Sequence, residues 1–406
     1  MSDFFQNGQI ATFHRLGQLD LERLEQELWK MTRVRGVSLV LPSLYAELSR
    51  PALRHIVEEL RSVRYIREIV VALGPCTHEE FKHAQEYFSI LPQKTTLLWI
   101  SGPRLQALIS QLHSEGRLDP GPYGKGQGAW LAYGYVIAEG RSEVIALHDC
   151  DIVTYSRELL GRLIYPVAST QLDFEFCKGY YSRVTDRMHG RVTRLFLTPL
   201  LRALIRMVGH LPILTYYDSF RYPLSGEFSM MTNLARLNRI PADWGLEVGV
   251  LAEIYRNCSV KRICQVELVE NYEHKHQDLS TEDKTKGLHR MAIDIAKSLF
   301  VTLESEGVTF SKGFFNSLRA SYKRIAQDMI VRYEGDAMIN GLHYDRHGEG
   351  TAVDLFTDVL REAGETVHDD PIGPPLIPNW NRVFAAFPDF DVRLLEAVRQ
   401  DNAGDD

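Results

Sequence analysis

The sequence predicts an α/β protein whose mostly parallel central sheet carries helices on both faces, followed by a helical C-terminal region. Two observations support this prediction. Short apolar runs alternate with longer stretches of helical periodicity through the first part of the chain, an order typical of parallel sheets. From about Thr281 the strand-like runs fade and helical periodicity continues alone, which indicates an added helical region.

Three strand-and-helix units open the predicted sheet. Val37 to Leu41 is a buried strand closed by Pro42, and a helical stretch follows it. Ile69 to Leu73 begins the second unit in the same way, and Thr95 to Ile100 is the third strand. A Rossmann dinucleotide fold would place G-x-G-x-x-G after the first strand, where residues 41–48 (LPSLYAEL) contain none. Nicotinamide chemistry is therefore disfavoured.

The composition excludes several classes of protein. A chain of 406 residues with 45% hydrophobic residues can bury a substantial core. A net charge of −7 argues against a nucleic-acid binder. No uncharged stretch reaches the ~18 residues of a membrane span, and charged residues interrupt the first apolar run too early for a signal peptide. We expect a cytoplasmic protein whose five cysteines, which lack C-x-x-C spacing, are reduced and buried.

Two aspartates follow the next strand of the predicted sheet. Val144 to Leu147 is a short buried strand, and Asp149 and Asp151 come after it, separated by one residue. Acidic side chains at such a strand end face the crevice where open α/β sheets bind ligands. Two carboxylates can share a hard divalent cation and leave coordination positions for substrate phosphates. The alternative is that the pair caps the next helix, Ser156 to Leu163.

A glycine-rich stretch precedes the acidic strand. Six glycines occur from Gly121 to Gly140, both included, and Lys125 is flanked by two of them. Glycines permit close approach of the backbone to a ligand, and a lysine can meet a phosphate as a point charge. The alternative is a flexible turn before a helix from Ala129 to Ala138.

An arginine-rich segment follows the acidic pair and suits an anion. Within it, Gly190 to Thr193 (GRVT) combines a glycine, a guanidinium, amides near a helix start and a hydroxyl. One alternative is a solvated helix face whose leucines pack on the core. Another takes Arg194 to Leu214 as an interfacial helix on an anionic membrane surface. The arginines concerned are Arg183, Arg187, Arg191, Arg194, Arg202 and Arg206.

Further candidate polar residues lie beyond this segment. Glu227 ends a loop punctuated by proline and glycine, and Glu247 stands just before an apolar helical stretch. A glutamate at a helix start also stabilises the helix dipole without any function. His274 and His276 do not share a helical face, so one can ligate a metal while the other points elsewhere. Exposed histidines without a task are the alternative.

The two ends of the chain carry less functional information. Residues 1–35 form a polar lead with a helical pattern that we expect to pack outside the main sheet. Residues 281–406 form the helical C-terminal region, with a proline-rich linker from Asp369, a last helix and a disordered NAGDD tail. Apolar faces of such added helices usually pack on their own domain or on a second subunit.

Taken in order, these segments resemble the glucosyl-3-phosphoglycerate synthase family of nucleotide-sugar glycosyltransferases, which have the GT-A fold. The resemblance covers residues from about Gly36 to Leu279, so residues 36–280 are the expected catalytic domain. The matching segments are LVLPSLYAE, GKGQGAW, HDCDI, KGYY, GRVTR, PLSGE, GLEVGVL and EHKHQ. D-x-D alone is unspecific, whereas this order and spacing are specific to the family.

The resemblance implies a metal-dependent transferase that moves glucose or mannose from a UDP, GDP or ADP sugar to 3-phosphoglycerate or glycerate, and a homodimer. It implies Mg²⁺ or Mn²⁺ at Asp149, Asp151 and His274. Glu247 would orient the attacking hydroxyl, and Asp151 would act with it in catalysis. The donor would meet Pro42, Leu44, Glu47, Lys125 and Asp149. The acceptor would meet Gly190, Arg191, Val192, Thr193, Gly226, Glu227 and His276.

The family retains the anomeric configuration, and the sequence offers no obvious double-displacement nucleophile, so a front-face transfer is implied. Two departures fall in the donor-base region. Tyr45, Ala46 and Glu47 replace the family's Asn-Glu-Glu, and LGPCTHE replaces its D-D-G-S-x-D segment. Two alternatives remain: the same fold with a membrane-lipid acceptor, and a nucleotide-sugar-binding protein without catalysis.

Overall fold

The computed structural model describes residues 5–6, 8–273, 287–373 and 375–403. An eight-stranded sheet runs through this part of the chain in the order β1-β8-β6-β7-β5-β2-β3-β4. All neighbouring strands pair in parallel except β7, which is antiparallel to both β5 and β6. The predicted mostly parallel sheet is therefore confirmed. The strands are β1 (Ala11–Phe13), β2 (Val37–Ser43), β3 (Glu68–Leu73), β4 (Lys94–Trp99), β5 (Val144–Leu147), β6 (Phe176–Tyr180), β7 (Phe228–Met231) and β8 (Ile263–Glu267).

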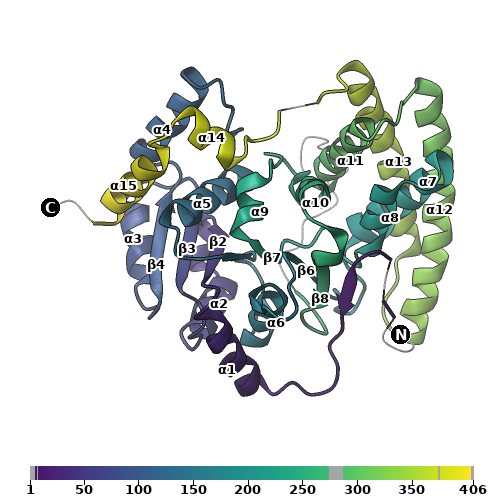
Figure 1. The fold of residues 1–406 in the computed structure, drawn as a ribbon. Coiled ribbons are helices and arrows are strands. Elements are labelled where there is room, and N and C mark those ends of the chain that lie inside the picture. Colours follow the sequence, from purple (N-terminus) through teal and green to yellow (C-terminus); the bar gives the residue numbers. More distant parts are fainter. Residues whose placement is uncertain (1–4, 7, 274–286, 374, 404–406) are drawn as a thin grey trace.

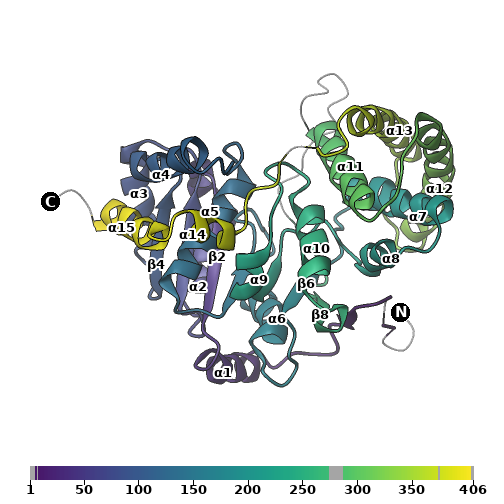
Figure 2. The same cartoon turned by 45° about the horizontal axis from the view of Figure 1, so that its top comes forward.

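Helices cover both faces of the sheet (Figures 1 and 2). Those of the sheet-forming part are α1 (Leu21–Thr32), η1 (Tyr45–Ser49), α2 (Pro51–Leu60), α3 (His78–Phe88), α4 (Pro103–Ser114), α5 (Lys125–Glu139), α6 (Arg157–Ala168), η2 (Val192–Leu197), α7 (Thr198–Val208), α8 (Pro212–Ser219), α9 (Thr232–Leu237), α10 (Leu246–Asn257) and η3 (Val260–Arg262). Those after the sheet are α11 (Gly287–Ser305), α12 (Lys312–Ile339), α13 (Arg346–Asp369), α14 (Trp380–Ala386) and α15 (Phe390–Ala403).

The continuous apolar strands follow from this double cover. In β2, Leu39 and Leu41 contribute to the hydrophobic cluster on one face of the sheet, whereas Val40 contributes to the cluster on the other. Successive side chains of a strand point to opposite faces, so a strand covered on both faces is apolar at nearly every position. The exception in this run, Ser38, is buried and donates a hydrogen bond of 2.9 Å to the Ser142 hydroxyl. This is why Val37 to Leu41 could be identified as a strand without any alternation of polar residues.

The prediction that residues 1–35 pack outside the sheet is only partly confirmed. Ala11 to Phe13 form the edge strand β1, which pairs in parallel with Cys264 to Val266 of β8. Three residues are too few to show a strand pattern in the sequence. Only α1 packs outside, against α6, where Leu24 and Leu28 are buried.

The C-terminal region divides between two places. Helices α11 to α13 pack against one another and against α7 and η2. The chain then crosses back over the molecule, and α14 and α15 lie near α4, α5 and β4 (Figure 1). Trp380 of α14 stacks on Trp130 of α5, with ring centroids 4.2 Å apart. The predicted last helix therefore joins the sheet-forming part and closes its β4 side.

The predicted disordered tail is partly wrong. Helix α15 continues to Ala403, and the side-chain amide of Asn402 donates to the Leu97 carbonyl at 2.8 Å. Its oxygen accepts from the Leu97 amide at 3.2 Å. Asn402 therefore satisfies both backbone groups of one residue on the outer strand β4, which orders the chain end.

The structure also argues against the alternative that Arg194 to Leu214 form a helix lying on a membrane surface. Within the predicted segment Arg194 to Leu214, the apolar face of α7 is covered by protein, because Leu200, Leu201 and Leu204 are buried against α12 and α8. A helix whose apolar face is already packed has none to insert into a lipid surface. Among the described residues, no helix combines the length and the apolar character needed to cross a bilayer.

Candidate active site

A cavity of 780 Å³ opens at the carboxyl ends of β2, β3 and β5. Its wall brings together segments that are far apart in the sequence, from Pro42 near the end of β2 to Ile295 in α11. Open α/β sheets bind ligands at this edge, because loops that leave parallel strands there enclose a crevice. The size is within the range typical of small-molecule sites.

The two predicted aspartates reach this cavity from the end of β5. Asp149 and Asp151 both line it, and the intervening Cys150 is buried. The next helix, α6, is capped by Ser156, whose hydroxyl accepts from the Leu159 amide at 3.3 Å. The alternative that the aspartates serve as the helix cap is therefore excluded.

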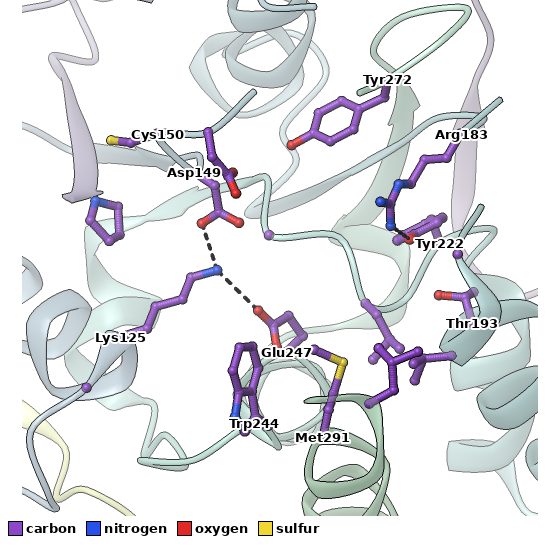
Figure 3. A pocket seen from close by; sticks show the side chains of 18 of the residues that line it. Lys125, Asp149, Cys150, Arg183, Thr193, Tyr222, Trp244, Glu247, Tyr272 and Met291 are labelled. Carbon is purple, nitrogen blue, oxygen red and sulfur yellow. Dashed lines mark hydrogen bonds and ion pairs between the residues drawn. The ribbon is translucent and has the colours of Figure 1, made fainter. Parts of the chain in front are cut away.

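Lys125 stands between two carboxylates at the start of α5 (Figure 3). Its Nζ lies 2.7 Å from Oδ1 of Asp149 and 3.4 Å from Oε1 of Glu247. Burial lowers the pKa of Lys125, but the charges of Asp149 and Glu247 outweigh it and hold the pKa above its usual value. The lysine is therefore a fixed positive charge in the cavity wall.

The glycines within the helix that begins at Lys125 serve its packing, whereas Gly121 and Gly124 lie in the bend before it. Helix α5 begins at Lys125, four residues before the predicted start. A Cβ on Gly126 would lie 2.6 Å from the Pro241 carbonyl oxygen, and one on Gly134 would overlap the ring of Trp380. These glycines allow other chain segments to approach the helix closely.

Gly226 gives the acidic pair its space. A Cβ at this position would lie 2.6 Å from Oδ2 of Asp149 and 3.2 Å from Nζ of Lys125. The neighbouring Ser225 carbonyl accepts a hydrogen bond of 2.6 Å from the buried Lys178, which lies on β6. The KGYY and PLSGE segments therefore work together, because Lys178 holds the loop that carries Gly226 against the sheet.

The electrostatics of the acidic pair favour a bound cation. Burial raises the pKa of Asp151 to about 7, and the charge of Asp149 adds to the rise. The adjacent His148 is fully buried, and burial lowers its pKa to about 4, so it stays neutral at physiological pH. Lys125, whose Nζ is 2.7 Å from Oδ1 of Asp149, lowers the pKa of Asp151 but does not cancel this rise. Additional positive charge would therefore stabilise the ionised pair. A divalent cation, for which carboxylate oxygens are suitable ligands, would provide it.

The predicted third metal ligand cannot be placed. His274 and the predicted acceptor residue His276 both lie outside the described residues. In the described part of the chain, no group of three histidine, cysteine, aspartate or glutamate side chains is arranged to hold a metal. Of the predicted ligands, the structure thus brings together Asp149 and Asp151.

The predicted donor residues form the wall near β2. Pro42, Leu44 and Glu47 line the cavity beside Gly74 and Tyr123. Glu47 is held by Arg50, with Nε and Oε2 3.3 Å apart. Two segments depart from the family pattern, residues 45–47 and the LGPCTHE segment that begins at Leu73. Both reach this wall, the first through Glu47 and the second through Gly74.

The predicted acceptor turn leads into η2, and Thr193 lies on the opposite side of the cavity from Asp149 (Figure 3). Gly190, Arg191, Val192 and Thr193 all line it. Gly190 has φ +74°, a left-handed conformation that favours glycine. The hydroxyl oxygen of Thr193 is buried and has no hydrogen-bond partner in the described part of the chain. Buried polar atoms are normally paired, so this oxygen is suited to meet a ligand.

Glu227, predicted to bind the acceptor, does not line the cavity as Gly190 to Thr193 and Gly226 do. It is fully buried behind the cavity wall, and its carboxylate accepts hydrogen bonds from the hydroxyls of Tyr181 and Tyr272. Burial raises its pKa, with Asp149 adding to the rise. The rings of the two tyrosines stack at 3.7 Å and line the cavity. Glu227 thus supports the wall instead of forming it.

Several lining residues were not among the predicted ones. Helix α11 adds an apolar edge that includes Met291, and the aromatic side chains of Tyr222, Trp244 and Tyr272 line the same cavity as Asp149 (Figure 3). These residues have no distinctive motif, although the aromatic pair in KGYY was a usable signal for Tyr181. They are Tyr123, Tyr181, Tyr222, Trp244, Tyr272, Leu288, Met291 and Ile295.

Comparison with curated proteins finds two similar chains. The chain is 47% identical over 405 residues to the glucosyl-3-phosphoglycerate synthase of Persephonella marina, covering 100% of each chain. It is 42% identical over 403 residues to that of Methanococcoides burtonii, covering 98% of each. A comparison with models of protein families finds no match.

Solved structures of glucosyl-3-phosphoglycerate synthase from Mycobacterium tuberculosis share the fold. The complex with Mg²⁺ and UDP is 21% identical with a TM-score of 0.51, covering 74% of this chain and 88% of that one. The complex with phosphoglyceric acid is 20% identical with a TM-score of 0.52, covering 75% and 90%. Another complex holds Mn²⁺, UDP-glucose and phosphoglyceric acid. With this fold, this cavity and full-length relatives at 47% and 42% identity, the chain belongs to the glucosyl-3-phosphoglycerate synthase family of glycosyltransferases.

Proposed function

We propose that the protein transfers glucose from a nucleotide sugar to 3-phosphoglycerate with retention of the anomeric configuration, using Mg²⁺ or Mn²⁺. One observation carries the proposal: a single cavity holds the acidic pair with Lys125 on one side and the Arg191–Thr193 turn on the other. A sugar diphosphate and a small anionic acceptor need these two kinds of site next to each other.

The donor diphosphate would lie between the acidic pair and Lys125. Asp149 and Asp151 would hold the cation, which when bound neutralises charge that develops on the departing nucleoside diphosphate. Lys125 already carries a stabilised positive charge in the cavity and would donate to a phosphate oxygen. Gly226 would leave the space that brings these groups together.

The acceptor would be held by its charged groups at the turn from Gly190 to Thr193. The Arg191 guanidinium would bind a phosphate or carboxylate, and the Thr193 hydroxyl would gain the partner it lacks. Glu247 lies 3.4 Å from Lys125, on the donor side of the cavity, and would orient the attacking hydroxyl. These placements keep Arg191, Thr193 and Glu247 in the roles expected from the sequence.

Retention is proposed from the family resemblance, and the carboxylates of the described cavity wall bear on its mechanism; they are Glu47, Asp149, Asp151 and Glu247. Glu47 pairs with Arg50, Glu247 with Lys125, and the aspartates are assigned to the cation. None of these is left over as a nucleophile for a double displacement, so we propose attack on the same face from which the diphosphate leaves.

The donor is proposed to be UDP-glucose, the sugar nucleotide in the complexes of the Mycobacterium tuberculosis synthase. GDP- and ADP-glucose, the mannose donors and glycerate as acceptor are the competing substrates. The proposal is tested by product formation with every donor and both acceptors, with Mn²⁺, with Mg²⁺ and with a chelator. We expect metal-dependent glucosyl-3-phosphoglycerate whose anomeric coupling in NMR matches that of the donor. Absence of metal-dependent transfer to 3-phosphoglycerate from any donor overturns the proposal.

A further inference from the structure

Glu349, which lies outside the motifs identified in the sequence, contacts the acceptor turn. It lies in the first turn of α13, 158 residues after Arg191 in the chain, and only 4% of its side chain is exposed. Its Oε1 accepts from Nε of Arg191 at 2.7 Å, and its Oε2 accepts from Nη1 of Arg194 at 2.8 Å. One buried carboxylate thus bridges both arginines of GRVTR.

The two arginines are engaged differently. Arg194 also donates through Nε to the His189 carbonyl at 2.9 Å and through Nη2 to the Met188 carbonyl at 3.4 Å. Its guanidinium lies 4.9 Å from the ring centroid of Tyr333. All three of its nitrogens are therefore engaged, since Nε and Nη2 hold the chain that leads into Gly190 and Nη1 binds Glu349, and its side chain is only 12% exposed.

Arg191 uses only its Nε atom in hydrogen bonds within the described part of the chain, and 31% of its side chain remains exposed at the cavity. A guanidinium is planar and rigid, with its two Nη groups at the far end of the side chain. A carboxylate that binds Nε therefore limits the directions in which the two Nη groups can point. Two guanidiniums and one carboxylate also leave one positive charge in excess, next to the cavity.

We infer that Glu349 is a positioning residue for the acceptor: it holds Arg191 so that its Nη groups face the cavity and bind the phosphate or carboxylate of the acceptor. This inference rests on the proposed function. It gives the C-terminal helices a part in acceptor recognition, because α13 supplies the carboxylate that orients the anion-binding arginine. A purely structural Glu349 would only attach α13 to η2, and its loss would alter stability without a preference for one substrate.

The test compares Glu349→Gln with a matched control. Glu349→Gln keeps the shape of the side chain, but removes the charge and puts an amide group against one arginine. Glu253→Gln is the control, because Glu253 is also a buried carboxylate that accepts from an arginine, Arg239, at 3.1 Å, yet it does not line the cavity. Both variants are first checked for folding by circular dichroism and thermal unfolding.

We expect Glu349→Gln to raise the KM for 3-phosphoglycerate by about 10-fold or more, since a misplaced anion-binding group weakens acceptor binding directly. The donor KM should stay within about twofold, and Glu253→Gln should leave both KM values unchanged. Glu349→Asp keeps the charge but shortens the reach, so its acceptor KM should lie between those of the wild type and Glu349→Gln. If Glu349→Gln does not fold, Glu349→Asp carries the same comparison.

An acceptor KM within about twofold of the wild type in a folded Glu349 variant overturns the positioning role, as does an equal rise in the donor KM. Either result leaves the proposed function standing, because the wild type would still transfer glucose. A wild-type protein without transfer to 3-phosphoglycerate is a separate result, visible before any variant is made, and overturns both proposals.

Discussion

The Nζ of Lys125 lies 2.7 Å from Oδ1 of Asp149, although 23 residues and an entire helix separate the two in the chain. The contact joins the start of α5 to the end of β5 at one edge of the sheet. It also places a permanent positive charge next to one carboxylate of the acidic pair. Four predictions follow from this arrangement and from the packing that supports it.

Lys125→Met should lower kcat/KM by about 10²-fold or more, because it removes a fixed charge from the position proposed for the diphosphate. It also leaves Asp149 without its ion pair, so the two aspartates repel each other more strongly. Steady-state kinetics at saturating 3-phosphoglycerate measure the effect. Lys297→Met is the control, since Lys297 pairs with Asp294 of its own helix and does not line the cavity. Equal activity of the two variants would contradict the role of Lys125.

Gly226→Ala should raise the Mn²⁺ concentration needed for half-maximal activity by about 10-fold. The new methyl group would lie 2.6 Å from Oδ2 of Asp149, so the carboxylate or the loop must move. Metal titration of the activity provides the measurement. Gly335→Ala is the matched control, because a Cβ there meets nothing within 4 Å, and alanine in the interior of α12 should stabilise the protein by up to about 1 kcal/mol. An unchanged metal requirement in Gly226→Ala would rule out this steric account.

Trp380→Ala should lower the free energy of unfolding by about 3–5 kcal/mol, the usual cost of removing a large buried aromatic side chain. Trp380 is fully buried, stacks on Trp130, and donates from its indole nitrogen to the Trp130 carbonyl at 3.1 Å. Urea unfolding gives the value. The same substitution at Trp29, whose side chain is exposed, should cost much less. Similar costs at both positions would mean that α14 does not hold the sheet-forming part.

Lys178→Met should change how stability depends on pH. Burial lowers the pKa of Lys178 to about 8, whereas an unfolded lysine titrates near its ordinary value of about 10.4. Between these values the unfolded chain binds a proton that the folded chain has lost, so the wild type gains stability as the pH rises. Relative to the variant, we expect a gain of about 1 kcal/mol per pH unit over this window.

The measurement is urea unfolding of the wild type and Lys178→Met from pH 7 to pH 11. Taking the difference between the two proteins removes the contributions of the other titrating groups, which both share. A difference that stays constant with pH would mean that Lys178 keeps its ordinary pKa in the folded protein.

Several features could be predicted because they depend on neighbouring residues. Val37 to Leu41 is apolar at every position except Ser38, a pattern typical of a strand covered on both faces. Thr77 and Glu80 form a capping box at the start of α3, which local spacing also determines. The motifs around Lys125, Asp149, Arg191 and Glu247 could be aligned with one family because their order is itself a property of the chain.

Other features depended on distant contacts. Glu227 stands next to Gly226 in a family segment, yet it is buried under Tyr181 and Tyr272, because neighbouring residues of an extended chain point to opposite sides. Likewise, three residues near the N-terminus form β1 only because β8 offers a free edge.

The class of fold, the order of the strand-and-helix units and the family can be read from the sequence, since apolar periodicity and motif order run along the chain. Which charges meet depends on the folded chain: Lys125 pairs with Asp149 and Glu247, and Glu349 pairs with Arg191 and Arg194. The strength of an ion pair falls with distance and with exposure to water. Both quantities are set by the packing of the whole chain, and by no local pattern within it.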